Sequence, residues 1–204
     1  VRALDDTATS MAIVAQTATV ALDLELKQEK SPALHGDGGL SHKSDTVGNA
    51  SYYYSLSRLR TSGTITLGDA EFEVSGTSWM DHEFSTSALG DRAQGWDWFG
   101  LHLDDQRDLM LGRIRLIDGG IEPAFGGLLV QPDGSTRYLD ANSFTITVLE
   151  TWISPHTGAE YPARWLLEVD TGEDKMLSMT LTPLLADQEL IEGAIIYWEG
   201  AVQI

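Results

Sequence analysis

GWDWFGLHLDDQRDLMLGRIRLIDGG, residues 95–120, holds the pattern that decides the fold. Two apolar runs flank the polar turn Asp104–Asp108, and an Asp-Gly-Gly turn ends the second run. In an extended strand Trp96 and Trp98 share one face and Asp97 takes the other. The stretch therefore predicts an antiparallel β-hairpin with one buried face.

The same pattern recurs along the chain. Further strand-length runs, each bounded by turn residues, are FGGLLVQ, FTITVLETW, RWLLEV and MLSMTLTPL. No segment carries a sustained helical period with helix caps. The sequence predicts an all-β, antiparallel meander, and closure of such a meander into a β-barrel removes its exposed edges.

Composition narrows the range of partners. The 204 residues include 31 Asp and Glu against 13 Lys and Arg, for a net charge of -18, which repels nucleic acid and anionic membrane surfaces. There is no cysteine, so disulfides, thiolate catalysis and cysteine-based metal sites are excluded. No apolar run is long enough to form a transmembrane helix.

A second stretch, GTSWMDHEFSTS at residues 76–87, carries the chemistry. In an extended strand Asp81 and Glu83 lie on one face and His82 on the other. A carboxylic acid or imidazolium placed among aromatic residues can donate a proton in apolar surroundings, because desolvation keeps a carboxyl protonated. His82, expected out of bulk water, is the sharper candidate, and its acidic neighbours favour the imidazolium.

Six blocks in order resemble one bacterial family. They are ALHGDGGLSHKS, ASYYYSLSRL, SGTSWMDHEFSTS, GWDWFGLHLDD with LMLGRIR, TWISPHTGAEYPARW, and YWEGAV. Together they resemble the AttH-like, or carotenoid 1,2-hydratase (CrtC)-like, two-domain lipocalin proteins, often labelled predicted secreted hydrolases. The resemblance implies tandem lipocalin-like β-barrels, with residues 1–88 forming part of the first and 89–204 most of the second. It also implies a location in the cell envelope or outside the cell, and a natural protein that extends beyond both ends of this chain.

The resemblance further implies a cofactor-independent enzyme, a hydro-lyase or cyclase, that acts on a long apolar isoprenoid or polyketide-like substrate. Its candidate catalytic residues are His82, Asp81 and Glu83. The candidate residues for binding a hydrophobic substrate or lipid are Trp79, Phe84, Trp96, Trp98 and Tyr53. Carotenoid hydratases carry Trp at the position of Phe84. A hydrolase is poorly supported, because the chain has no GxSxG nucleophile motif.

Other interpretations stay open at this level. His82 is alternatively a structural hydrogen-bonding residue, which is the commoner role of a histidine between two acids, with Arg58, Arg60 and Arg113 as available partners. The protein is alternatively a non-catalytic lipid-binding lipocalin, or its second barrel is filled by its own side chains and only supports the first. No metal is expected, since adjacent strand residues diverge. The remaining histidines, including His35, are expected on loops or on the surface, and the sequence leaves the oligomeric state open.

Overall fold

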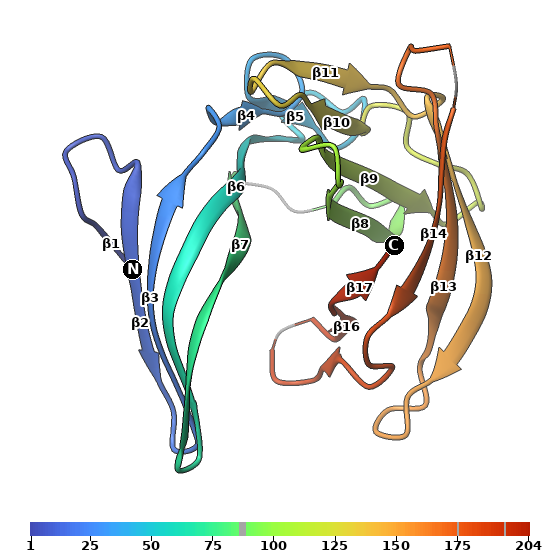
Figure 1. Cartoon of the computed structure of the whole chain (residues 1–204). Coiled ribbons are helices and arrows are strands. Elements are labelled where there is room, and N and C mark those ends of the chain that lie inside the picture. The colour runs from blue at the N-terminus through green and yellow to red at the C-terminus, as the bar shows by residue number, and fades with distance from the viewer. Residues whose placement is uncertain (86–88, 175, 194) are drawn as a thin grey trace. The chain divides into compact units, whose positions relative to one another are not determined.

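A computed structural model describes residues 1–85, 89–174, 176–193 and 195–204 (Figure 1). These residues form β-strands, turns and loops, and all the strand pairs are antiparallel. The predicted all-β class with a lipocalin-like architecture is confirmed. Within the described ranges no helix is long and apolar enough to cross a membrane.

The first sheet has seven strands and is organised around one long strand, β6. Its members are β1 (Arg2–Ala3), β2 (Ser10–Gln16), β3 (Val20–Gln28), β4 (Ala33–Leu34), β5 (Leu40–His42), β6 (Ala50–Leu67) and β7 (Ala70–Phe84). β6 pairs with β3, β4, β5 and β7. It therefore holds the motif on β7 against the Gly-rich loop region that carries β4 and β5.

The second sheet contains the hairpin that the opening stretch predicts. Its order is β11 (Thr136–Leu139), β10 (Gly127–Val130), β9 (Asp108–Leu116) and β8 (Ala93–His102). The β8–β9 turn places Gln106 at a φ of 68°, and the Asp105 carboxylate accepts a hydrogen bond from the Arg107 backbone N–H at 3.0 Å. Such a local Asp-to-backbone bond is a common way of closing a tight turn.

The remaining strands follow residue 141. β12 (Phe144–Ile153), β13 (Glu160–Val169), β14 (Leu177–Pro183) and β17 (Val202–Gln203) form a four-stranded sheet, and β15 (Glu189–Leu190) pairs with β16 (Tyr197–Trp198). Trp165, Leu167, Val169 and Leu181 are buried there. The alternation of Trp165, Leu167 and Val169 along β13 matches the period-two pattern of the run RWLLEV.

Residue contacts divide the chain into two compact units, Val1–Ala141 and Asn142–Ile204. The predicted domain boundary falls at residue 88, outside the described residues, and stays a prediction. The first unit holds both the seven-stranded sheet and the β8–β11 sheet. The candidate site below lies within it.

Two apolar clusters pack on opposite faces of β6. One face contributes Leu56 and Leu59 to a cluster with Met11 and Leu26. The other contributes Tyr53, which packs with Met110, Ile114 and Phe125 of the β8–β11 region. A β-bulge between Leu56 and Leu59 shifts the alternation, so that Ser57 and Arg58 together oppose Trp79 of β7.

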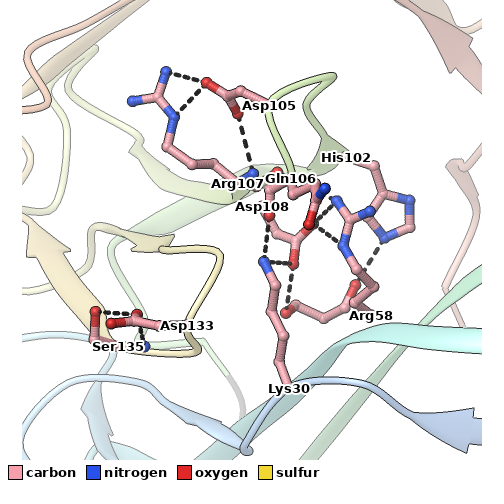
Figure 2. Close-up of polar contacts among 10 residues, drawn as sticks. Lys30, Arg58, His102, Asp105, Gln106, Arg107, Asp108, Asp133 and Ser135 are labelled. Carbon is pink, nitrogen blue, oxygen red and sulfur yellow. Dashed lines mark hydrogen bonds and ion pairs between the residues drawn. The ribbon is translucent and has the colours of Figure 1, made fainter.

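A buried ionic network joins the two sheets of the first unit (Figure 2). Asp108, fully buried at the start of β9, accepts hydrogen bonds from Lys30 Nζ at 2.8 Å and Ser57 Oγ at 2.9 Å. Arg58 binds the same carboxylate through Nη2 at 2.5 Å and Nε at 3.1 Å. Lys30 Nζ also donates to the Gln106 carbonyl at 2.5 Å. Two cations thus compensate one buried anion, as a buried charge requires.

Candidate functional site

The register of β6 against β7 divides the Asp-His-Glu motif between two faces. Ser55 stands opposite Asp81, Tyr54 opposite His82, and Tyr53 opposite Glu83. Because side chains alternate along a strand, the two acids point to one face and the imidazole to the other. This separation is as the sequence predicts. The three ionisable groups therefore do not converge on one substrate.

Neutral donors surround the Asp81 carboxyl. Its Oδ1 accepts a hydrogen bond from the Ser55 hydroxyl and a second from Trp79 Nε1 at 2.9 Å. Desolvation raises the pKa of Asp81, the two hydrogen bonds and the nearby Tyr53 hydroxyl lower it, and the charge of Glu83 adds to the rise. Asp81 is an exposed residue, as His82 is, but its carboxyl lies against Ser55 and Trp79.

His35 belongs to this site. It lies on the loop between β4 and β5, as one of the two expected placements has it, but it is buried and not on the surface. The residue is 3% exposed, and its Nε2 lies 2.7 Å from Ser55 Oγ. Its ring stacks on Tyr53 at a centroid distance of 3.8 Å. Burial lowers the pKa of His35 to about 4, helped by the nearby Lys43 charge and opposed by Glu83.

The sequence signal that could have indicated burial of His35 is the glycine that follows it. Gly36 has a φ of 63°, and a Cβ there would meet the Leu40 carbonyl oxygen at 2.2 Å. Only glycine allows so close a fold of the loop. The chain turns back on itself at Gly36, and this turn places the His35 imidazole against Tyr53 of β6.

Glu83 shares a face with Asp81 but has a different environment. Lys43 Nζ lies 2.5 Å from Glu83 Oε1, and Ser51 Oγ donates to the same oxygen at 2.5 Å. Lys43 also lies over the Phe125 ring, 4.2 Å from its centroid. Glu83 is therefore an ion-paired carboxylate, suited to holding Lys43 and loop residues in place rather than to donating a proton.

Three of the predicted substrate-binding aromatics gather next to Asp81. Trp79 and Trp98 meet edge to face at 6.1 Å, and Trp98 Nε1 donates to the Tyr53 hydroxyl at 3.1 Å. Trp98 is 37% exposed, so part of its indole faces solvent. Trp96 lies two residues earlier on the same face of β8. Phe84 lies on the opposite face of β7 and stacks with Tyr52 at 5.4 Å.

His82 is exposed, and the expectation that its ring is withdrawn from bulk water is wrong. Its Nδ1 lies 2.9 Å from the Tyr54 hydroxyl, and its ring meets Phe84 edge to face at 5.4 Å. The suggested arginine partners have other carboxylates. Arg58 binds Asp108, Arg60 lies 3.6 Å from Glu29, and Arg113 binds Asp97 at 2.6 Å. The catalytic role assigned to His82 stays a prediction without the burial that motivated it.

A cavity of about 340 Å³ adjoins this group of residues. Its lining residues are His35, Gly36, Asp37, Ser41, His42, Ala124, Phe125, Gly126, Gly127 and Tyr138. His35 thus has the cavity on one side and Ser55 on the other. Among the residues that the structure describes, no cluster of three His, Asp or Glu side chains could hold a metal ion.

The comparisons with known proteins agree with the architecture. The model of the AttH-like family matches residues 1–204. The crystal structure of an AttH protein from Nitrosomonas europaea is similar at 33% identity and a TM-score of 0.84, over 94% of this chain and 58% of that chain.

A second structure, kievitone hydratase from Nectria haematococca, is similar at 17% identity and a TM-score of 0.71, over 90% of this chain and 54% of that chain. At this identity the likeness establishes the fold alone. By these coverages, the present chain spans little more than half the length of each of the two structures. No curated protein sequence matches it.

Proposed function

The chain belongs to the AttH-like family, and from this membership and the geometry at Asp81 we propose that it is a hydratase-like enzyme. It acts without a cofactor on an apolar isoprenoid or polyketide-like alkene, which it hydrates or cyclises. The observation that carries the proposal is the Asp81 carboxyl, held by the neutral donors Ser55 and Trp79 and with a raised pKa. Such an acid keeps a proton available for transfer.

The reaction follows from the side chains around that carboxyl. Asp81 gives its proton to one alkene carbon, the π electrons form the new C–H bond, and a carbocation is left on the neighbouring carbon. Trp79 donates to the carboxyl and Trp98 meets Trp79 edge to face, so two indoles lie near the acid. The face of an indole attracts a cation by about 0.5 to 2 kcal/mol. Water then forms the C–O bond, and the proton that it loses returns to the Asp81 carboxylate.

Cyclisation differs only in the group that captures the cation. If a second double bond of the same substrate lies closer than water, its π electrons form a C–C bond instead and leave a cation on the next carbon. This cation then loses a proton from an adjacent carbon to the Asp81 carboxylate, so that a C=C bond forms and the product is an isomer of the substrate. The polar residues supplied by this chain are the same in both reactions. The location in the cell envelope or outside the cell, implied by the resemblance, belongs to the same proposal.

The test is incubation of the purified protein with a lipid extract of its own host, followed by mass spectrometry. We expect a species that has gained one water, or an isomer of a recovered lipid. Asp81→Asn, which keeps the hydrogen-bond acceptor but not the acid, should lower the rate by about 10²- to 10⁴-fold. His82→Ala, on the opposite face of β7, is measured beside it: retained turnover would assign the acid to Asp81 alone, and lost turnover would restore the role predicted for His82.

Two results would contradict the proposal. Equal turnover in wild type and Asp81→Asn would remove the acid from the reaction. A lipid that binds the wild type and is always recovered unchanged would identify a lipid-binding lipocalin instead of an enzyme.

A further inference from the structure

A hydrogen-bonded chain of three side chains connects the interior of the first unit to Asp81. His35 Nε2 lies 2.7 Å from Ser55 Oγ, and the Ser55 hydroxyl donates to Asp81 Oδ1. Ser55 is fully buried and His35 is 3% exposed. The first two members of the chain are therefore shielded from competing water.

The hydrogen bonds from His35 through Ser55 to Asp81 all run in one donor-to-acceptor direction. A serine hydroxyl has one proton, so when Ser55 donates to Asp81 it can only accept from His35. His35 must then carry its proton on Nε2. Because His35 and Ser55 are buried, the bond between them polarises the next, and a donor to Ser55 strengthens the bond that Ser55 makes to the carboxylate.

The His35 ring has little freedom to turn away. It stacks on Tyr53 with an interplanar angle of 13°. Its backbone N–H donates to the Tyr53 carbonyl at 3.1 Å, and its own carbonyl accepts from the Gly39 N–H at 3.0 Å. The loop is anchored to β6 on both sides of the imidazole.

We propose that His35 is a positioning residue for Asp81: its Nε2–H fixes the Ser55 proton toward the carboxyl and so sets the acid strength of Asp81. Nδ1 is then the nitrogen that titrates, and His35 lines the cavity described above. Both charge states of the ring keep Nε2–H, so the chain keeps its direction when the ring titrates. The catalytic meaning of this role rests on the function proposed above, but the role itself can be measured without a substrate.

Several charged groups surround the ring. Lys43 and Glu83 act on it from the loop and from β7, and Asp81 lies beyond Ser55. Asp37 and His42 line the same cavity. A measurement of the His35 pKa therefore needs a reference protein in which these charged groups are unchanged.

The first measurement is nitrogen NMR of the histidine side chains in the wild-type protein, with His35→Gln identifying the His35 signals among the five histidines. We expect the neutral ring to be protonated on Nε2. A neutral ring protonated on Nδ1 would overturn the proposal, because Ser55 would then donate to His35 and not to Asp81. This result needs no variant that alters the fold.

The second measurement is the pKa of Asp81, read from its side-chain carboxyl carbon. His35→Leu removes the donor, whereas the glutamine amide introduced by His35→Gln reaches the former Nε2 position and keeps one. We expect His35→Leu to raise the Asp81 pKa by roughly half a unit to one unit, and His35→Gln to leave it near the wild-type value. Equal Asp81 pKa values in both variants and wild type would contradict the positioning role.

Failure here can be separated from failure of the proposed function. If the NMR results hold and no lipid is converted, the reaction is wrong and the hydrogen-bonded chain stands. If Asp81→Asn abolishes turnover while His35→Leu changes neither the Asp81 pKa nor the rate, the reaction stands and the positioning role is wrong.

Discussion

Asp108 and Asp81 lie in the same compact unit, and both carboxyls are contacted by serines of β6, yet their surroundings differ in charge. Asp108 is fully buried and receives Lys30 and Arg58, so its negative charge is compensated by two cations. Asp81 accepts its hydrogen bonds from Ser55 and Trp79, both neutral, and the nearby cation Lys43 is ion-paired with Glu83. The contrast separates a carboxylate that fastens two sheets together from a carboxyl that can exchange its proton.

The sharpest way to break this comparison is to remove each acid and measure stability. Asp108→Ala leaves Lys30 and Arg58 facing an empty buried position, and we expect the free energy of unfolding to fall by about 3 to 5 kcal/mol. Asp81→Asn keeps an acceptor for Ser55 and Trp79 and should cost less than about 1.5 kcal/mol. Urea denaturation followed by circular dichroism measures both, and similar losses would erase the distinction.

A pH series sharpens the comparison on the Asp81 side. In the unfolded chain His35 titrates near its ordinary value of 6.5, whereas burial holds the folded pKa at about 4. Below pH 6.5 the unfolded state takes up a proton that the folded state does not, so stability falls as the pH drops from 6.5 toward 4. The expected loss from this group is about 3 kcal/mol.

The control for this series is His35→Gln, which has no titrating ring. Asp81, whose pKa is raised, opposes the trend by favouring the folded state at low pH, and it is present in both proteins. The difference between their stability curves therefore reports His35 alone. Parallel curves between pH 6.5 and 4 would mean that the ring is not held neutral in the folded protein.

The smallest expected effect is on the opposite face of β7. His82 is exposed, and its ring nitrogen contacts the Tyr54 hydroxyl. We expect His82→Ala to change the free energy of unfolding by no more than about 0.5 kcal/mol, as is usual for exposed positions. Thermal unfolding measures this, and a loss as large as that of Asp108→Ala would assign the structural role to the imidazole instead.

The sequence predicts what depends on local periodicity. The β8–β9 hairpin and the separation of His82 from Asp81 and Glu83 both follow from the two-residue period of a strand, and both are confirmed. Burial is harder to predict, because it depends on which elements cover a strand. Met80 and Phe84 suggest a buried setting for His82, but that face of β7 is open at His82.

Contacts between residues that are far apart in the sequence could not be predicted either. Lys30 and Asp108 are 78 residues apart, and His35 and Ser55 are 20 residues apart on different strands or loops. No local pattern connects such residues. In the sequence, Asp108 is only the last residue of a polar turn. The folded structure brings Arg58 and Ser57 of β6 into contact with it.

The bulge in β6 gives the strand two roles. Before it, Ser55 serves Asp81; within it, Ser57 and Arg58 turn together toward Asp108. Deleting one residue there would restore the regular alternation of side chains along β6. Either Ser55 or the pair Ser57 and Arg58 would then point to the opposite face of the strand. An evolving chain could therefore not change the residue count between positions 55 and 58 without losing either the contact of Ser55 with Asp81 or the joint between the two sheets.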